Sequence, residues 1–135
     1  MKALLSIAVF FIAISVNAQK LQNGSYSTVG YINSDGKVQS SSYSTIGYIK
    51  DGKVQNGSYS TIGYIKNGKV QNGSYSTIGY VNSDGKIQNG SYSTIGYIKD
   101  GKVQNGSYST IGYYDKSIPV EHVAAFFFFF FTDQL

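Results

Sequence analysis

The sequence predicts an all-β protein in which short β-hairpin repeats close into a ring. The motif Tyr-Ser-Thr-(Val/Ile)-Gly-Tyr occurs six times, at intervals of 17, 16, 16, 17 and 16 residues. These intervals are too short for two-helix repeats. The repeated segments are rich in Tyr, Thr, Ile and Val, which favour strands, and a central glycine disfavours helix. The motif copies are Tyr26–Tyr31, Tyr43–Tyr48, Tyr59–Tyr64, Tyr75–Tyr80, Tyr92–Tyr97 and Tyr108–Tyr113.

Each repeat is expected to hold two strands joined by a tight turn. In the third copy these strands are residues 61–65 and 69–71, and Asn67-Gly68 lies between them. Asn-Gly favours a type I′ turn, because both of its central residues need positive φ. A two-residue loop at this point sets Ile65 opposite Val70 and Tyr64 opposite Gln71.

The two longer repeats carry one extra residue in this turn. They contain Ser34-Asp35-Gly36 and Ser83-Asp84-Gly85, which still end in glycine. A three-residue loop with a left-handed glycine and a bulge fits this pattern. The extra residue is therefore expected to leave the register of the strands unchanged, as it must if the same side chains are to face the core.

Strict alternation along the strands predicts two faces for each repeat. We expect Gly63 to leave a gap on its face, where a neighbouring backbone or side chain can come close. Both faces carry apolar groups, so we expect both to be covered. One face holds Thr61, Gly63, Ile65 and Val70, and the other holds Ile62, Tyr64 and Gln71.

The two ends of the repeat region are complementary half-units. The N-terminal end begins with a fragment of the second strand type, Leu21-Gln22-Asn23, and the last copy stops after the first type, Thr110–Tyr114. Pairing of these ends would close the ring and remove the exposed edges that make open sheets aggregate. We therefore expect closure rather than an open array.

The chain divides into a signal peptide at residues 1–18, a hairpin repeat domain at 19–116 and a phenylalanine-rich tail at 117–135. A basic start, Met1-Lys2, precedes an apolar run, Ala3–Val16, and the small residues of Val16-Asn17-Ala18 suit cleavage after Ala18. We expect export to the periplasm, cell surface or medium, with no transmembrane span after signal removal. The alternative is an uncleaved N-terminal anchor.

The tail holds six consecutive phenylalanines, Phe126–Phe131, after Pro119, which can open a helix. This apolar stretch is too short to span a bilayer. Six exposed phenylalanines would be an aggregation liability, so something must cover them. The centre of the closed ring is one candidate, with the tail as a central plug. A membrane surface and a partner chain are the others.

Composition argues against several functions. The net charge is +4, and it comes from lysine alone, without the arginine that suits bidentate phosphate recognition, so no nucleic-acid partner is expected. There is no cysteine for a disulfide or a zinc-thiolate site. His122 is the single histidine, and the serines have no histidine base beside them. We predict no catalytic, cofactor-binding or metal-binding residue and no enzymatic activity, and the binding residues stay unassigned.

These motifs resemble the five-fold β-flower family of exported bacterial repeat proteins. The resemblance rests on the repeated segment of residues 54–65, on the Asp-Gly-Lys turns and on the tail that ends in Ala-Ala-Phe-Phe-Phe, and it covers nearly the whole mature chain. It implies hairpins arranged radially and no settled function. The chain has six Gly-Tyr copies but five Asp/Asn-Gly turns. Either five hairpins form the flower with extra end strands, or closure of the ends makes a sixth petal.

Three non-enzymatic functions fit the repeats. The first is a structural or interaction protein of the bacterial envelope, with an envelope protein as partner. The second is a multivalent glycan-binding module built on the tyrosines Tyr31, Tyr48, Tyr64, Tyr80, Tyr97 and Tyr113, with glutamines opposite. The third, weaker alternative is a fibril-forming solenoid with a ladder of Gln39, Gln55, Gln71, Gln88 and Gln104. The tyrosines can also serve in packing alone.

Overall fold

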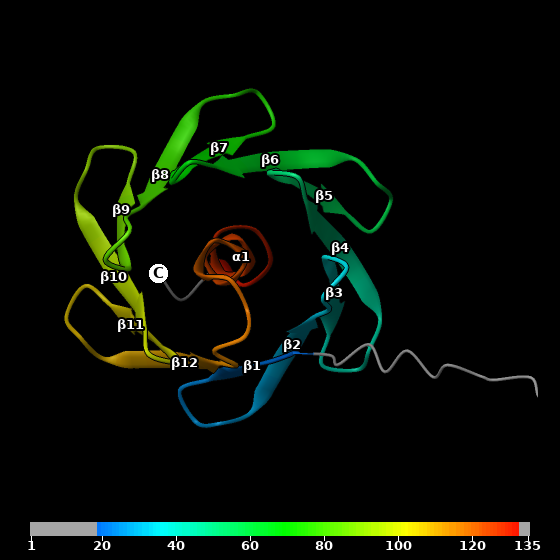
Figure 1. Ribbon diagram of the computed structural model, residues 1–135, viewed down its shortest axis with the longest axis horizontal. Coiled ribbons are helices and arrows are strands. Elements are labelled where there is room, and N and C mark those ends of the chain that lie inside the picture. The colour runs from blue at the N-terminus through cyan, green and yellow to red at the C-terminus, as the bar shows by residue number, and fades with distance from the viewer. Residues whose placement is uncertain (1–18, 133–135) are drawn as a thin grey trace, which may run out of the picture.

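The computed structural model describes residues 19–132 and shows a closed ring of twelve antiparallel strands around a central helical segment (Figure 1). Each strand pairs with its two neighbours in the chain, so chain order and spatial order coincide. The predicted signal peptide, residues 1–18, lies outside the described residues. The strands are β1 (Gln19–Asn23), β2 (Thr28–Ile32), β3 (Lys37–Ser40), β4 (Thr45–Lys50), β5 (Lys53–Asn56), β6 (Thr61–Lys66), β7 (Lys69–Asn72), β8 (Thr77–Val81), β9 (Lys86–Asn89), β10 (Thr94–Lys99), β11 (Lys102–Asn105) and β12 (Thr110–Tyr114).

The ring closes where the first strand pairs with the last. Leu21 lies opposite Tyr114, and Asn23 lies opposite Gly112. These are the two half-units at the ends of the repeat region, so the predicted closure is confirmed. Together with the five Asp/Asn-Gly hairpins, this pairing makes a sixth unit. The connections that follow β1, β3, β5, β7, β9 and β11 project outward like petals (Figure 1).

The Asn67-Gly68 turn sets the register predicted for its hairpin. Asn67 has φ of 53° and Gly68 has φ of 77°, as a type I′ turn requires. Ile65 lies opposite Val70, and Tyr64 lies opposite Gln71. The local turn chemistry therefore fixed which residues face each other.

In the longer repeats the extra residue is confined to the turn, as predicted. The Gly36 N–H donates to the carbonyl oxygen of Asn33 at 2.9 Å, and Gly36 has φ of 89°. This is a type I turn that ends in a left-handed glycine. Beyond the turn, Tyr31 lies opposite Gln39. The strand register is therefore that of the shorter repeats.

A bulge in every even-numbered strand makes the predicted face of Thr61 wrong. Val54 lies opposite Gly63, but the next residue, Gln55, lies opposite Thr61, so Ile62 is an extra residue. Residues directly opposite each other share a face, which places Thr61 on the outer face with Gln55. Ile62 was expected on the outer face, but it is half-buried and packs against the core.

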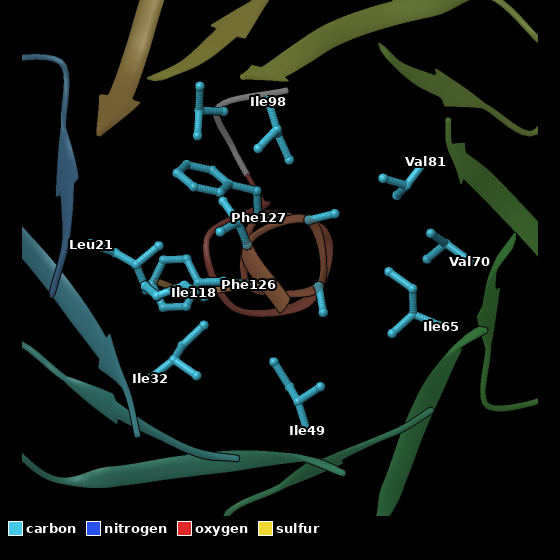
Figure 2. Close-up of a cluster of buried hydrophobic side chains, with 14 of the residues drawn as sticks. Leu21, Ile32, Ile49, Ile65, Val70, Val81, Ile98, Ile118, Phe126 and Phe127 are labelled. Carbon is cyan, nitrogen blue, oxygen red and sulfur yellow. The ribbon is translucent and has the colours of Figure 1, made fainter. Parts of the chain in front are cut away.

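Aliphatic side chains line the inside of the ring and surround the helical segment (Figure 2). Burial of these side chains removes apolar surface from water and is the main force that holds the ring around its centre. Alternation along the strands delivers one such side chain from most strands. The buried strand residues are Leu21, Ile32, Val38, Ile49, Val54, Ile65, Val70, Val81, Ile87, Ile98 and Val103.

The C-terminal tail enters the ring and occupies its centre, as the plug hypothesis expected (Figure 1). Helix α1 (Val120–Ala125) begins directly after Pro119, and it continues into a π-helix, η1 (Phe126–Phe130). Phe126 and Phe127 are 1% exposed. The ring of Phe126 lies beside Leu21 and Ile118, and the ring of Phe127 lies on the side of Ile98 (Figure 2). Phe128–Phe131 are half-buried.

Phenylalanine rings of the tail fill the gaps that the repeat glycines leave. A Cβ atom at Gly112 would lie 2.9 Å from Cζ of Phe127, so only glycine leaves room for this ring. The π-helix contributes because its i→i+5 hydrogen bonds widen the turn, and consecutive rings reach β2, β12, β8, β6 and β4. The pairs formed among the described residues are Gly30 with Phe126, Gly112 with Phe127, Gly79 with Phe128, Gly63 with Phe129 and Gly47 with Phe130.

None of the helices found in residues 19–132 has the length and apolarity needed to cross a membrane.

Candidate functional site

The petal tips are tight turns in which tyrosine takes the position that usually needs glycine. In the turn between β5 and β6, the Asn56 side-chain Oδ1 accepts hydrogen bonds from the backbone N–H groups of Ser58, at 2.9 Å, and Ser60, at 3.1 Å. The Tyr59 N–H donates to the carbonyl oxygen of Asn56 at 3.0 Å. Tyr59 has φ of 66° and therefore occupies the left-handed position that follows a type I turn.

This backbone conformation is strained for a residue with a Cβ, at about 1–2 kcal/mol. The same conformation recurs at every petal tip, with φ between 64° and 66°. The strain must therefore be offset by contacts of the tyrosine side chain. We call these residues the turn tyrosines: Tyr26, Tyr43, Tyr59, Tyr75, Tyr92 and Tyr108.

Each turn tyrosine stacks on a tyrosine of the neighbouring petal. The ring centroids of Tyr59 and Tyr48 are 4.6 Å apart with an interplanar angle of 11°, and the two hydroxyls are 3.0 Å apart. Such pairs contribute about 0.5–1.5 kcal/mol beyond area burial. The stacking therefore offsets much of the backbone strain. The six pairs are Tyr26–Tyr113, Tyr31–Tyr43, Tyr48–Tyr59, Tyr64–Tyr75, Tyr80–Tyr92 and Tyr97–Tyr108.

The glutamines opposite the strand tyrosines hold the petal tips in place. Gln55 donates from Nε2 to the carbonyl oxygen of Tyr59 at 3.0 Å, and Gln71 makes the same bond to Tyr75. Gln22, Gln39, Gln88 and Gln104 repeat it. The amide nitrogens are thus used within their own repeats, and no glutamine ladder forms in the ring.

Hydrogen bonding within the pairs raises the pKa of the strand tyrosines. The Tyr59 hydroxyl and partial desolvation raise the pKa of Tyr48 above its ordinary value, and the Tyr75 hydroxyl does the same to Tyr64. These two phenols therefore stay protonated over a wider pH range than free tyrosine. The pKa is also raised in the strand tyrosines Tyr80, Tyr97 and Tyr113 and in the turn tyrosine Tyr43.

A polar groove adjoins the Tyr48–Tyr59 pair. Its volume is about 280 Å³, and it is lined by these two rings together with Asp35, Lys37, Lys50 and Gln55. Asp35 comes from one of the two longer turns, and its charge contributes to the raised pKa of Tyr48. An aromatic face, two ammonium groups, a carboxylate and an amide are thus within reach of one small ligand.

A second copy of this combination recurs three petals further round the ring. The residues 49 positions later are Asp84, Lys86 and Lys99, beside the Tyr97–Tyr108 pair. The charge of Asp84 contributes to the raised pKa of Tyr97, as that of Asp35 does at Tyr48. Because only the two longer turns supply this aspartate, the six petals are not all alike. The same combination of residues therefore occurs at two places in the ring.

The end of the ring where the tail enters is also hollowed. Glu121 accepts a hydrogen bond from the Gly68 N–H at 3.2 Å, and cavities of about 300 and 440 Å³ lie on the two sides of Val120. Burial lowers the pKa of His122, and the nearby charge of Glu121 opposes this shift. Within residues 19–132, no three His, Cys, Asp or Glu side chains gather closely enough to hold a metal ion.

Sequence reasoning singled out the strand tyrosines but missed the turn tyrosines. The signal is present in the sequence, because the tyrosine of Asn-Gly-Ser-Tyr stands where a type I turn usually has glycine. All six repeats have a tyrosine at this position, including the second, which has Ser-Ser-Ser-Tyr. A bulky residue repeated at a position that favours glycine indicates that its side chain has a specific partner. The structure identifies this partner as the strand tyrosine of the next petal.

The protein is a closed ring of antiparallel hairpin repeats around an apolar C-terminal plug. The chain matches the family described as "5-fold beta-flower protein" over residues 18–131, and it belongs to that family. Its six petals depart from the five that the description gives. The comparisons with curated proteins and with solved structures gave no match.

Proposed function

We propose that the protein is a non-enzymatic, exported structural or interaction protein of the bacterial envelope. The observation that carries this proposal is the set of turn tyrosines, whose side chains are 60–65% exposed at the petal tips. Tyrosine is enriched at protein interfaces because it presents a large apolar face with a polar end. Hydrogen bonds and stacking hold these rings in place, so a partner would meet a preorganised surface.

Export is supported by the basic start at Met1-Lys2 and the apolar run at Ala3–Val16. A cysteine-free chain also folds without dependence on the redox state of its compartment. Fractionation of the producing cells, with N-terminal sequencing of the mature protein, tests this part. We expect Gln19 as the first residue and recovery outside the cytoplasm. Recovery in the cytoplasm with Met1 retained would contradict export.

The interaction surface is tested by sedimentation of the purified protein with isolated cell envelopes. A variant with glycine in place of all six turn tyrosines keeps a residue that accepts positive φ but loses the rings. We expect the wild-type protein to sediment with the envelopes and this variant to stay in solution. A matched control carries alanine at the exposed serines that precede the turn tyrosines, at positions 25, 42, 58, 74, 91 and 107. Equal sedimentation of all three proteins would exclude the tyrosines as the contact.

A second candidate function, a glycan-binding module, is favoured by the polar groove beside the Tyr48–Tyr59 pair and by the second copy of its residues beside Tyr97–Tyr108. Sugars combine ring faces that pack on aromatic groups with hydroxyls that bond to carboxylates, amides and ammonium groups. Two weak sites on one rigid ring would gain from multivalency if both reach one polysaccharide. A glycan array that compares the wild-type protein with the double variant Lys50→Ala/Lys99→Ala tests this function. Absence of any bound glycan would reject it.

The weaker alternative, a fibril-forming solenoid, has less support than the other two. Every described strand already has two partners in the closed ring, so no open edge is available for further pairing. The glutamine amides are bonded within their own repeats. A monodisperse monomer in light scattering would exclude fibril assembly.

A further inference from the structure

The stacked tyrosine pairs join neighbouring petals on the outside of the ring, in addition to strand pairing and the core. Tyr59 lies at the tip of the β5–β6 connection, and its partner Tyr48 belongs to β4. The pair Tyr26–Tyr113 spans the place where the ring closes between β1 and β12. A covalent bond within each pair would therefore fasten every petal to the next, including the first to the last.

The pair geometry brings two phenols into the arrangement that oxidative coupling needs. Four pairs have their hydroxyl oxygens 3.0 Å apart, and the six interplanar angles lie between 11° and 13°. The ortho carbons are bonded to the carbons that carry the hydroxyls, so they lie at the same converging edges of the two rings. Centroid separations of 4.3–4.6 Å leave no room for another group between the rings.

The turn tyrosines are also accessible from solution. Their side chains are 60–65% exposed at the petal tips, so a peroxidase can reach them. Coupling requires the ring of the turn tyrosine to rotate about its side-chain bonds, from the stacked position into the twisted position of a biaryl. Their strand partners are held more firmly, because they belong to β-strands of the closed ring.

We propose that the six stacked tyrosine pairs are sites of dityrosine formation, which latches the ring covalently. This inference needs only the fold and is independent of the proposed function. In a chain without cysteine, dityrosine supplies the kind of cross-link that a disulfide gives other proteins. The bond across Tyr26–Tyr113 is the most consequential, because it joins the two ends of the repeat region.

The oxidant is a peroxide used by a peroxidase, which removes electrons one at a time. Each phenol loses one electron and its hydroxyl proton to give a tyrosyl radical, and the two radicals form a carbon–carbon bond between their ortho carbons. The hydrogen on each of these carbons then moves to the phenolic oxygen, which restores both aromatic rings. One hydrogen peroxide is reduced to two waters, and the protein loses two hydrogen atoms for each bond.

The experiment treats dilute purified protein with horseradish peroxidase and hydrogen peroxide, and then digests it with trypsin. Cleavage after lysine places the two tyrosines of every pair on different peptides. For example, Tyr26 is in residues 21–37 and Tyr113 is in residues 103–116. The peroxide is limiting, because each of the six peptides holds tyrosines of two pairs and complete coupling would join all six peptides. We then expect dityrosine fluorescence in the monomer and six linked peptide pairs, each lighter by two hydrogen atoms than the sum of its parts. Linked peptides that follow no structural pair, or coupling found only in dimers, would overturn the proposal.

Two conservative variants test the link at the closure of the ring. Tyr113→Phe keeps the stacked ring but removes the phenol, and we expect it to abolish the link between residues 21–37 and 103–116 while the other five persist. Tyr114→Phe is the matched control, because Tyr114 is the adjacent residue and packs against the core instead of stacking in a pair. It should retain all six links. A link that survives in Tyr113→Phe, or is lost in Tyr114→Phe, would also overturn the assignment.

A functional latch should raise resistance to unfolding. A cross-link between distant residues restricts the unfolded chain and stabilises the native state by the same argument as a disulfide. We expect the oxidised wild-type monomer to unfold at a higher temperature than the untreated protein, and the oxidised Tyr113→Phe variant to show a smaller gain. An identical shift in the two oxidised proteins would show that the Tyr26–Tyr113 link adds nothing.

Discussion

Phe129 places the edge of its ring where a Cβ atom of residue 63 would lie. The glycine of the repeat and the phenylalanine of the tail therefore form a single packing unit. Four more glycine–phenylalanine pairs share this relation. The glycine of the repeat is therefore needed to leave room for the phenylalanine rings of the plug. The ring and its tail are thus fitted to each other residue by residue.

Replacement of Gly63 by alanine is expected to destabilise the protein by about 1–3 kcal/mol, as overpacking of a filled core does. The added methyl group would meet Phe129 and would lie 2.6 Å from the backbone oxygen of Gln71. Chemical denaturation of the variant and the wild-type protein measures the loss. A wild-type midpoint for Gly63→Ala would contradict the contact.

Gly57→Ser is the matched control for this substitution. Gly57 lies at a petal tip, and the second repeat already has Ser41 at the equivalent position. We expect this variant to stay close to wild-type stability. The double variant Gly63→Ala/Phe129→Ala should lose less than the sum of the two single losses, because the smaller side chain relieves part of the clash.

Truncation of the phenylalanines should have effects that follow their burial. Phe127 is 1% exposed, so Phe127→Ala is expected to cost about 3–5 kcal/mol through lost burial and a cavity. Phe131 is half-buried, and Phe131→Ala should cost clearly less. Denaturant midpoints of the two variants check this order. Equal losses would mean that the tail does not sit in the ring as described.

The register and closure of the ring could be predicted from the sequence because both depend on local chemistry. Asn67-Gly68 selects a tight turn, and this turn decides that Ile65 faces Val70. The two ends of the repeat region are complementary half-units, and only pairing of these ends leaves no strand edge unpaired. Six consecutive phenylalanines also predicted that the tail is shielded from water, and in the structure the tail packs in the centre of the ring.

The parts that could not be predicted depend on contacts between distant residues. The bulge at Ile62 moves Thr61 to the outer face, and the adjacent Gly63 was interpreted as a gap for a close neighbour and not as the mark of a bulge. The left-handed Tyr59 is stable because of its stack on Tyr48 in another petal. The π-helix directs consecutive phenylalanine rings to glycines on different strands of the ring, so its form depends on where those glycines lie. Strand alternation and helix propensity carry no information on such contacts.

The strained backbone at Tyr59 predicts an unusual order of stability for two truncations. Tyr59→Gly and Tyr59→Ala both lose the stack on Tyr48, but alanine keeps the strain of positive φ. We expect the alanine variant to be less stable than the glycine variant by about 1 kcal/mol. The same two substitutions at Ser58, which is not left-handed, should not show this order. Thermal unfolding of the four variants measures it, and an alanine variant as stable as the glycine variant would refute the strain argument.

The paired phenols predict a loss of stability at alkaline pH. One tyrosine of each pair, five strand tyrosines and the turn tyrosine Tyr43, has a pKa raised above the ordinary value of about 10 in the folded state, chiefly by the hydrogen bond to the partner hydroxyl. Above that pH the unfolded chain binds fewer protons than the folded chain, so the free energy of unfolding falls as pH rises. Below it the stabilisation is fully present. Thermal unfolding between neutral and strongly alkaline pH should show this decline.

A phenolate absorbance titration assigns the alkaline effect to the pairs. Tyr59→Phe removes the hydroxyl that bonds to Tyr48, so we expect the pKa of Tyr48 to fall toward its ordinary value and the number of phenols with a raised pKa to fall by one. Tyr114→Phe removes a phenol that belongs to no pair and should leave that number unchanged. If all phenols of the folded wild-type protein titrate together at the ordinary pKa, the hydroxyl contacts do not persist in solution.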